Sequence, residues 1–180
     1  MKKSFKRIVI KAGTSILTSR DGKFSSGNLT RLGTEISRLY HKKKQIVLVS
    51  SGAIALGMEA SGLTHRPTEM ASLQACAAVG QGKLMHAYEK FFAKRGIHSA
   101  QLLLTRDGLE DRGRFLKARR TLEELIKMKT LPIVNENDTI ATEEIAFGDN
   151  DVLSVQVAHL IQADLLVILS DVDGFYLKDG

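Results

Sequence analysis

The stretch Ile46-Val47-Leu48-Val49-Ser50-Ser51-Gly52 decides the fold class that the sequence predicts. Its first four residues are all apolar, which fits a strand buried on both faces, since a strand with one face in water alternates apolar and polar residues. The run Leu165-Leu166-Val167-Ile168-Leu169 has the same character. We therefore expect an α/β protein, a three-layer αβα sandwich with a mainly parallel central sheet.

The remaining chain alternates short β-branched runs with longer segments of helical period, as expected for parallel strands joined by helical crossovers. Strands are predicted at 6–10, 46–49, 97–104, 131–134 and 165–169. A first helix is expected to be capped by Asn28, and further helices are predicted at 52–59, 68–95, 112–128 and 152–162, with Gly80 and Gly82 able to break or bend the long one. The length of 180 residues fits one domain of ordinary size.

Composition narrows the possible partners. Lys+Arg 26 against Asp+Glu 20 gives a net charge of +6, which suits an anionic partner such as a nucleotide, a nucleic acid or an acidic metabolite. The single Cys76 excludes an internal disulfide and is expected to be buried, and no apolar run is long enough for a membrane span or a signal peptide. We therefore expect a cytoplasmic protein with no membrane partner.

A basic stripe at 112–120 is the one pattern that favours nucleic acid. Arginine and lysine recur there, but only Phe115 could stack on a base, whereas single-strand binders use several aromatic side chains. We expect a solvated or subunit-facing helix and no nucleic-acid partner.

Ligands of such sandwiches bind beyond the carboxyl ends of the strands, so the residues after each strand are the site candidates. They are small and polar in this chain, and comprise Lys11–Ser15, Ser50–Gly52, Thr105–Asp107, Asn135–Asp138 and Ser170–Asp171. Gly13 and Gly52 let backbone N–H groups approach an anion, and Lys11 can reach a phosphate as a point charge. Taken alone, these residues also fit ordinary turns and a solvated lysine.

Two loops place amides beside carboxylates, Asn135-Glu136-Asn137-Asp138 and Gly148-Asp149-Asn150-Asp151. Their oxygens suit an amino-acid ammonium group; a metal is the alternative, although no protein-ligated metal motif is present and we expect no metal ligands. Asp151 could also be a plain helix-cap acid. The P-loop and dinucleotide fingerprints are both missing from the sequence.

In order along the chain, the motifs resemble those of the amino acid kinase family. They are Val9–Ser15, Val49–Ala55, Ala77–Gln81, Leu103–Arg106, Asp111–Leu116, Val134–Asp138 and Gly148–Asp151. The last two are most similar to the branch of the family that phosphorylates the side chain of glutamate. The resemblance covers residues 8–180.

This resemblance implies transfer of the γ-phosphoryl group of ATP to the side-chain carboxylate of L-glutamate, the first step of proline biosynthesis. By similarity, Lys11 and Asp151 would be the catalytic pair, and Ser51, Asp138 and Asn150 would bind glutamate. Lys11, Gly13, Ser170 and Asp171 would contact the nucleotide, where relatives often have Thr in place of Ser170. Mg²⁺ would be carried by the ATP phosphates. The loop from Glu136 to Phe147 resembles one that senses proline as a feedback inhibitor, and we expect a homo-oligomer.

In the family, the polypeptide continues past the counterpart of Gly180 through a second catalytic lysine and a glycine-rich ATP segment, often into a PUA domain. We therefore expect residues 1–180 to be an amino acid kinase domain without PUA domain, incomplete on its C-terminal, nucleotide-binding side, with little kinase activity. The alternatives are a non-catalytic glutamate- or proline-binding module and another amino acid kinase, such as acetylglutamate kinase.

Overall fold

A computed structural model describes residues 5–140 and 150–171. In this part of the chain the strands β1 (Arg7–Ala12), β2 (Gln45–Ser50), β3 (His98–Leu104), β4 (Thr130–Glu136) and β5 (Leu165–Leu169) form one sheet in the order β3-β4-β2-β1-β5. All four pairings are parallel. The helices are α1 (Thr14–Leu17), α2 (Ser26–His41), α3 (Ala53–Ala60), α4 (Met70–Ala93), α5 (Arg106–Glu110), α6 (Arg112–Lys127) and α7 (Asn150–Leu160).

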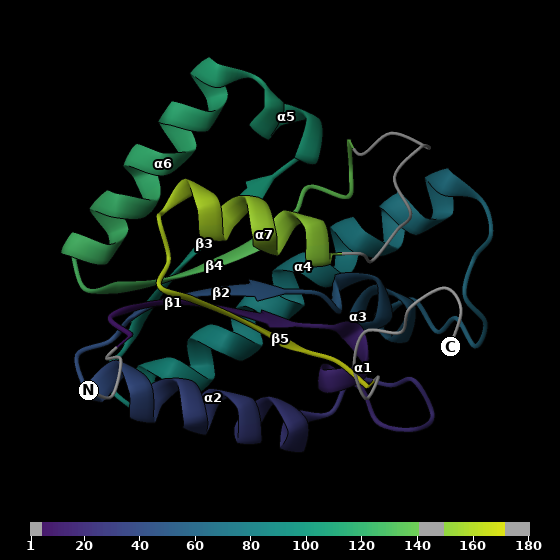
Figure 1. The fold of residues 1–180 in the computed structure, drawn as a ribbon. Coiled ribbons are helices and arrows are strands. Elements are labelled where there is room, and N and C mark those ends of the chain that lie inside the picture. The colour runs from purple at the N-terminus through teal and green to yellow at the C-terminus, as the bar shows by residue number, and fades with distance from the viewer. Residues whose placement is uncertain (1–4, 141–149, 172–180) are drawn as a thin grey trace, which may run out of the picture.

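Helices cover both faces of the sheet, so the predicted three-layer sandwich is confirmed (Figure 1). Successive side chains of a strand point to opposite faces. In β2, Ile46 and Leu48 therefore join the core beneath α2 and α4, while Val47 and Val49 join the core beneath α5, α6 and α7. This explains why the central strands are apolar at every position rather than at alternate ones.

Two predictions about helices were wrong. The N-cap of α2 is Ser25 rather than Asn28: the Ser25 hydroxyl accepts from the Asn28 N–H at 3.2 Å, and the Asn28 amide donates to Thr18 O at 2.8 Å. Asn28 therefore ties the helix to the preceding loop from its first turn. The long helix α4 runs unbroken through Gly80 and Gly82.

Helix α4 is uninterrupted because it lies directly against α3. A Cβ atom on Gly80 would lie 1.7 Å from the carbonyl oxygen of Ala53, and one on Gly57 would lie 1.8 Å from that of Cys76. The glycine at position 80 thus serves close packing between helices rather than a bend. Cys76 is buried and free, as predicted.

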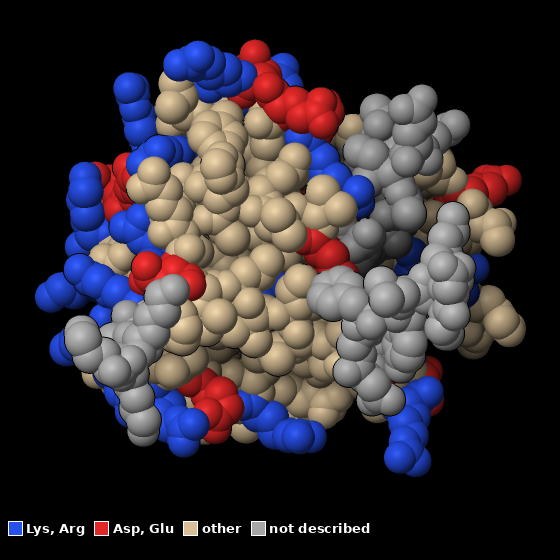
Figure 2. Space-filling model, viewed as in Figure 1, with Lys and Arg blue, Asp and Glu red and all other residues tan. Residues whose placement is uncertain are grey.

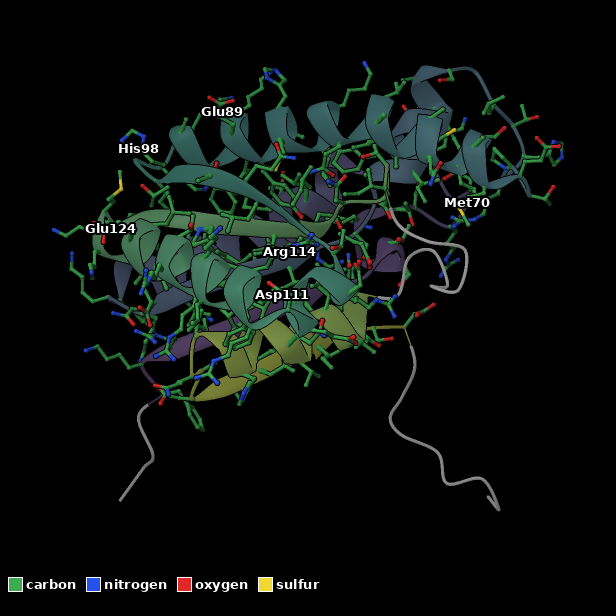
Figure 3. The ribbon with its side chains drawn as sticks, turned by 90° about the horizontal axis from the view of Figure 1, so that it is seen from above. Met70, Glu89, His98, Asp111, Arg114 and Glu124 are labelled. Atoms are coloured by element: carbon green, nitrogen blue, oxygen red, sulfur yellow. The ribbon has the colours of Figure 1, made fainter. Side chains whose placement is uncertain are left out.

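The direction of α4 places its first turns at the carboxyl edge of the sheet. Figure 3 shows Met70, its first residue, and His98, the first residue of β3, at opposite ends of the molecule.

Two short helices were not predicted: α1, and α5, whose N-cap Thr105 accepts from Gly108 N. Helix α6 then starts where Asp111 accepts from the N–H of Arg114 at 2.8 Å, two residues labelled in Figure 3. Of the helices that the structure describes, none combines the length and the apolarity needed to cross a bilayer.

Candidate functional site

Lys11 lies near the end of β1 and is only 7% exposed. Its Nζ is 2.6 Å from Oδ1 of Asp151, which lies in the first turn of α7. Burying an ammonium group is costly unless a charge pairs with it, and the carboxylate of Asp151 offsets part of that cost at this edge of the sheet. Gly13 leaves room for this side chain, since a Cβ there would lie 3.1 Å from Lys11 Nζ.

A buried network of amides lies beside this pair. Asn150, the first residue of α7, directs its side-chain Nδ2 at Ser50 O (3.1 Å), Ser51 Oγ (2.9 Å) and Asn135 Oδ1 (2.9 Å). The network therefore joins the carboxyl ends of β2 and β4 to the N-terminus of α7. Asn150 was predicted to bind substrate, and it also holds two strand ends together.

The turn after β2 has a conformation that favours glycine. Gly52 has φ +103°, in the left-handed region, and α3 begins directly after it without a side-chain cap. Two residues before Gly52, the Oγ of Ser50 lies 2.8 Å from the hydroxyl of Tyr88 in α4. Burial raises the pKa of Tyr88, which keeps it a neutral phenol that fixes this turn.

These segments enclose a polar cleft. It is lined by Thr14, Ser51, Gly52, Ala53, Ile54, Ala55, Arg66, Asn135, Asp138 and Asn150. All three residues predicted to bind substrate, Ser51, Asp138 and Asn150, thus line one cleft. Arg66 was missed, because it lies in the loop between α3 and α4 and follows no strand.

Burial raises the pKa of Asp138 to about 6, and the negative charge of Glu136 adds to the effect, while Arg66 opposes it. Glu136 pairs with Arg106 across 3.3 Å, and burial outweighs that pairing to raise the pKa of the Glu136 carboxyl as well. Carboxyl groups with perturbed pKa values cluster at functional sites, so this end of the cleft is a candidate ligand site.

The predicted nucleotide-binding residues lie at the ends of β1 and β5. Gly13 N donates to Leu169 O at 3.4 Å, which brings Gly13 next to the start of the Ser170-Asp171 pair. Ser170 and Asp171 are exposed, and Ser170 Oγ is 3.5 Å from Asp171 Oδ1. Their contact with a nucleotide stays a prediction.

Some predicted features lie outside the described residues. These are Gly148 and Asp149 of the second amide loop and the part of the proline-sensing loop at 141–147. Over 5–140 and 150–171, no three His, Cys, Asp or Glu side chains are grouped so that they could hold a metal ion.

The fold is matched by known proteins. The model of the amino acid kinase family matches residues 6–180, so the chain belongs to this family. The carbamate kinase of Giardia has the same fold, with a TM-score of 0.62 and 18% identity over 94% of this chain and 74% of the other.

Among its relatives, the chain is 49% identical over 173 residues to "Glutamate 5-kinase" of Caldanaerobacter subterraneus subsp. tengcongensis, covering 96% of this chain and 46% of the relative. It is 51% identical over 171 residues to the protein of that name in Streptococcus suis, covering 95% and 48%. For the one in Symbiobacterium thermophilum the identity is 48% over 174 residues, covering 97% and 66%. The chain thus spans about half the length of the first two relatives and 66% of the length of the third.

Proposed function

We propose that the chain binds L-glutamate for transfer of the γ-phosphoryl group of ATP to its side-chain carboxylate, which yields L-glutamyl 5-phosphate, the first step of proline biosynthesis. The observation that carries the proposal is the buried Lys11, 2.6 Å from Asp151, beside a cleft lined by Ser51, Asp138 and Asn150. The identity of 49% to a relative named glutamate 5-kinase supports it.

The ammonium group of glutamate is assigned to the acceptor end of the cleft. Asp138 offers a carboxylate there, and Asn150 offers its carbonyl oxygen, because its Nδ2 is already directed at three protein oxygens. The hydroxyl of Ser51 borders the same space. Charge-assisted hydrogen bonds to an ammonium group are about twice as strong as neutral ones, so this end of the cleft would orient the substrate.

The reacting carboxylate is assigned to the other end, near Lys11. Asp138 follows β4 and Lys11 lies in β1, with β2 between them, so the two strand ends are about 10 Å apart at the usual spacing of strands. That span accommodates a glutamate side chain and the phosphoryl group that it receives. Because a carboxylate needs no base to act as nucleophile, Lys11 would mainly position and neutralise the transferred group.

Further parts of the proposal concern ATP and regulation. ATP would approach Gly13, Ser170 and Asp171, with Mg²⁺ bound to its phosphates and neutralising their charge. Proline would compete at the glutamate cleft as a feedback inhibitor. The homo-oligomeric state and the cytoplasmic location stay predictions from the sequence.

Calorimetric titration of the chain with L-glutamate, N-acetylglutamate and L-aspartate tests the substrate. We expect saturable binding of glutamate at one site and weaker binding of the other two, because the acceptor end needs a free ammonium group. Tighter binding of N-acetylglutamate would instead favour an acetylglutamate kinase. ADP release in a coupled assay with glutamate and MgATP then separates a kinase from a non-catalytic binding protein.

A further inference from the structure

Main-chain groups show which atom of each buried amide is the oxygen and which is the nitrogen. The N–H of Glu136 can only donate, and it lies 2.9 Å from Oδ1 of Asn135, so that atom is the oxygen. Nδ2 of Asn135 is then the atom that faces Gln81, at 2.8 Å. Because Nδ2 donates, the atom of Gln81 that faces it must be the oxygen Oε1.

The same argument fixes Asn150. Its Nδ2 donates to the main-chain oxygen of Ser50 and to Oδ1 of Asn135, so its own carbonyl oxygen is the atom left for the cleft. A chain of three amides with one polarity thus runs from Gln81 through Asn135 to Asn150. Reversal of any one amide would set donor against donor or acceptor against acceptor.

Gln81 keeps this orientation at a cost. Its Nε2 is buried and has no hydrogen-bond partner among the described residues. An unpaired buried donor typically costs about 1–3 kcal/mol. An apolar side chain at this position would have no unpaired donor. The glutamine therefore contributes to the site through its acceptor Oε1, which forms the hydrogen bond with Asn135.

Gln81 is also held in place by its neighbour. Gly80 packs against Ala53, whose carbonyl oxygen would be 1.7 Å from a Cβ at position 80, and Ala53 itself lines the cleft. The backbone of α4 at this point is therefore fixed relative to the cleft wall. The hydrogen bond that Gln81 Oε1 accepts from Asn135 Nδ2 ties the amides of β4 and α7 to this fixed position.

We propose that Gln81 is a positioning residue of the ligand site: it fixes the amide of Asn135 and, through it, the amide of Asn150 with the carbonyl oxygen facing the ligand's ammonium group. This inference rests on the proposed function for the identity of the ligand. Gln81 is not assigned a contact with the ligand itself.

The test replaces Gln81 in two ways. Gln81→Met removes the acceptor at nearly constant length, whereas Gln81→Glu retains an oxygen facing Asn135. Gln101→Met, at an exposed glutamine of β3, is the matched control. Calorimetry measures glutamate affinity, and NMR measures hydrogen exchange of the Asn135 and Asn150 side-chain amides without ligand.

We expect Gln81→Met to weaken glutamate binding about tenfold, the effect of one lost hydrogen bond in a binding site. It should also speed exchange of the Asn150 amide and leave the melting temperature nearly unchanged, since it removes one unpaired donor and creates another. Gln81→Glu and Gln101→Met should bind as the wild type does.

Unchanged affinity and exchange in Gln81→Met would overturn the inference. So would a folded Gln81→Glu variant that binds glutamate about tenfold more weakly than the wild type. This arm decides the matter if Gln81→Met fails to fold. If the wild-type chain binds no glutamate, the proposed function fails, while the amide exchange still decides whether Gln81 positions Asn150.

Discussion

The side chain of Lys11 is 8% exposed and that of its partner Asp151 is 48% exposed. Most of the desolvation free energy of the pair therefore comes from the lysine. The attraction between the two charges offsets this penalty only in part, because solvent at Asp151 screens it. Such a pair contributes little net stability, so its value lies in holding a positive charge where phosphate charge would develop. The two residues should therefore respond differently to substitution.

Lys11→Met is expected to leave the free energy of unfolding within about 1 kcal/mol of the wild type, because an apolar side chain suits the buried site and the side chain of Asp151 is 48% exposed to water. Asp151→Asn leaves a buried ammonium group unpaired and should lower that free energy by about 1–2 kcal/mol. Urea unfolding measures both. A larger loss in Lys11→Met than in Asp151→Asn would contradict this account. Both variants should abolish phosphoryl transfer wherever the wild type shows it.

The raised pKa of Asp138, about 6 against an ordinary 3.8, makes stability depend on pH. Because the folded state holds this proton more tightly than the unfolded state, the contribution to stability is complete below about pH 4 and is lost as the pH rises through about 6. We expect Asp138→Asn to remove this decline and to be up to about 2 kcal/mol more stable than the wild type at pH 7.5. Thermal melts between pH 4.5 and 8 measure the difference.

Ligand binding should have the opposite pH dependence, since an ammonium group needs the ionised carboxylate. Glutamate affinity is expected to rise between pH 5 and 7 in the wild type and to be weak and flat in Asp138→Asn. The control is Glu110→Gln, at an exposed carboxylate of α5, which should keep the wild-type profile. Equal pH profiles for all three proteins would show that Asp138 does not control either property.

At the level of elements, the strands were the most predictable part because each central strand is a run of apolar residues covered on both sides. The predicted ends of β1 and β4 were too early. Ala12 and Glu136 extend the ladders although one is small and the other charged. Strand ends that carry site residues lack the apolar signal on which the prediction depends.

The same reason separates the predicted site residues from the missed ones. Ser51 and Asp138 follow strands, and the rule that ligands bind at the carboxyl edge identifies such positions without a structure. Arg66 lies in a loop and Gln81 inside a helix, so the packing of α3 against α4 at their crossing is what brings Arg66 to the cleft and Gln81 to Asn135 in its wall. That crossing depends on Gly57 and Gly80. The sequence pattern presented Gly80 only as a residue able to break or bend the long helix, and it gave no sign of the role of Gly57.

Two glycines of one helix make a matched test of this crossing. Gly80→Ala would place a methyl group 1.7 Å from Ala53 O, so α3 and α4 must separate, and we expect a loss of at least about 3 kcal/mol in unfolding free energy together with weaker glutamate binding. Gly82→Ala meets nothing within 4 Å and should gain about 0.5–1 kcal/mol from helix propensity. Chemical denaturation measures both. Similar effects of the two substitutions would contradict the role assigned to the crossing.

On the scale of the whole molecule, charge is unevenly distributed. The face seen in Figure 2 has an uncharged centre, with lysine, arginine and acidic side chains around it. A groove between α2 and the edge strand β5 lies there, and among the described residues β5 pairs only with β1. The groove is lined by Phe5, Ile8, Ile10, Leu32, Glu35, Ile36, Leu39, Lys44, Leu165, Val167 and Leu169. An open strand edge beside an apolar groove favours association with further polypeptide.

The last prediction follows from this face. The chain should associate increasingly between micromolar and millimolar concentration, because pairing at β5 would satisfy backbone groups and bury apolar surface at once. Val167→Lys puts a charge in the groove and should reduce association strongly with little change in circular dichroism, whereas Met128→Lys, at a side chain 65% exposed beyond α6, should not. Sedimentation at several concentrations measures this. A wild type that stays monomeric throughout would show that the charged rim alone suffices to keep β5 apart from other chains.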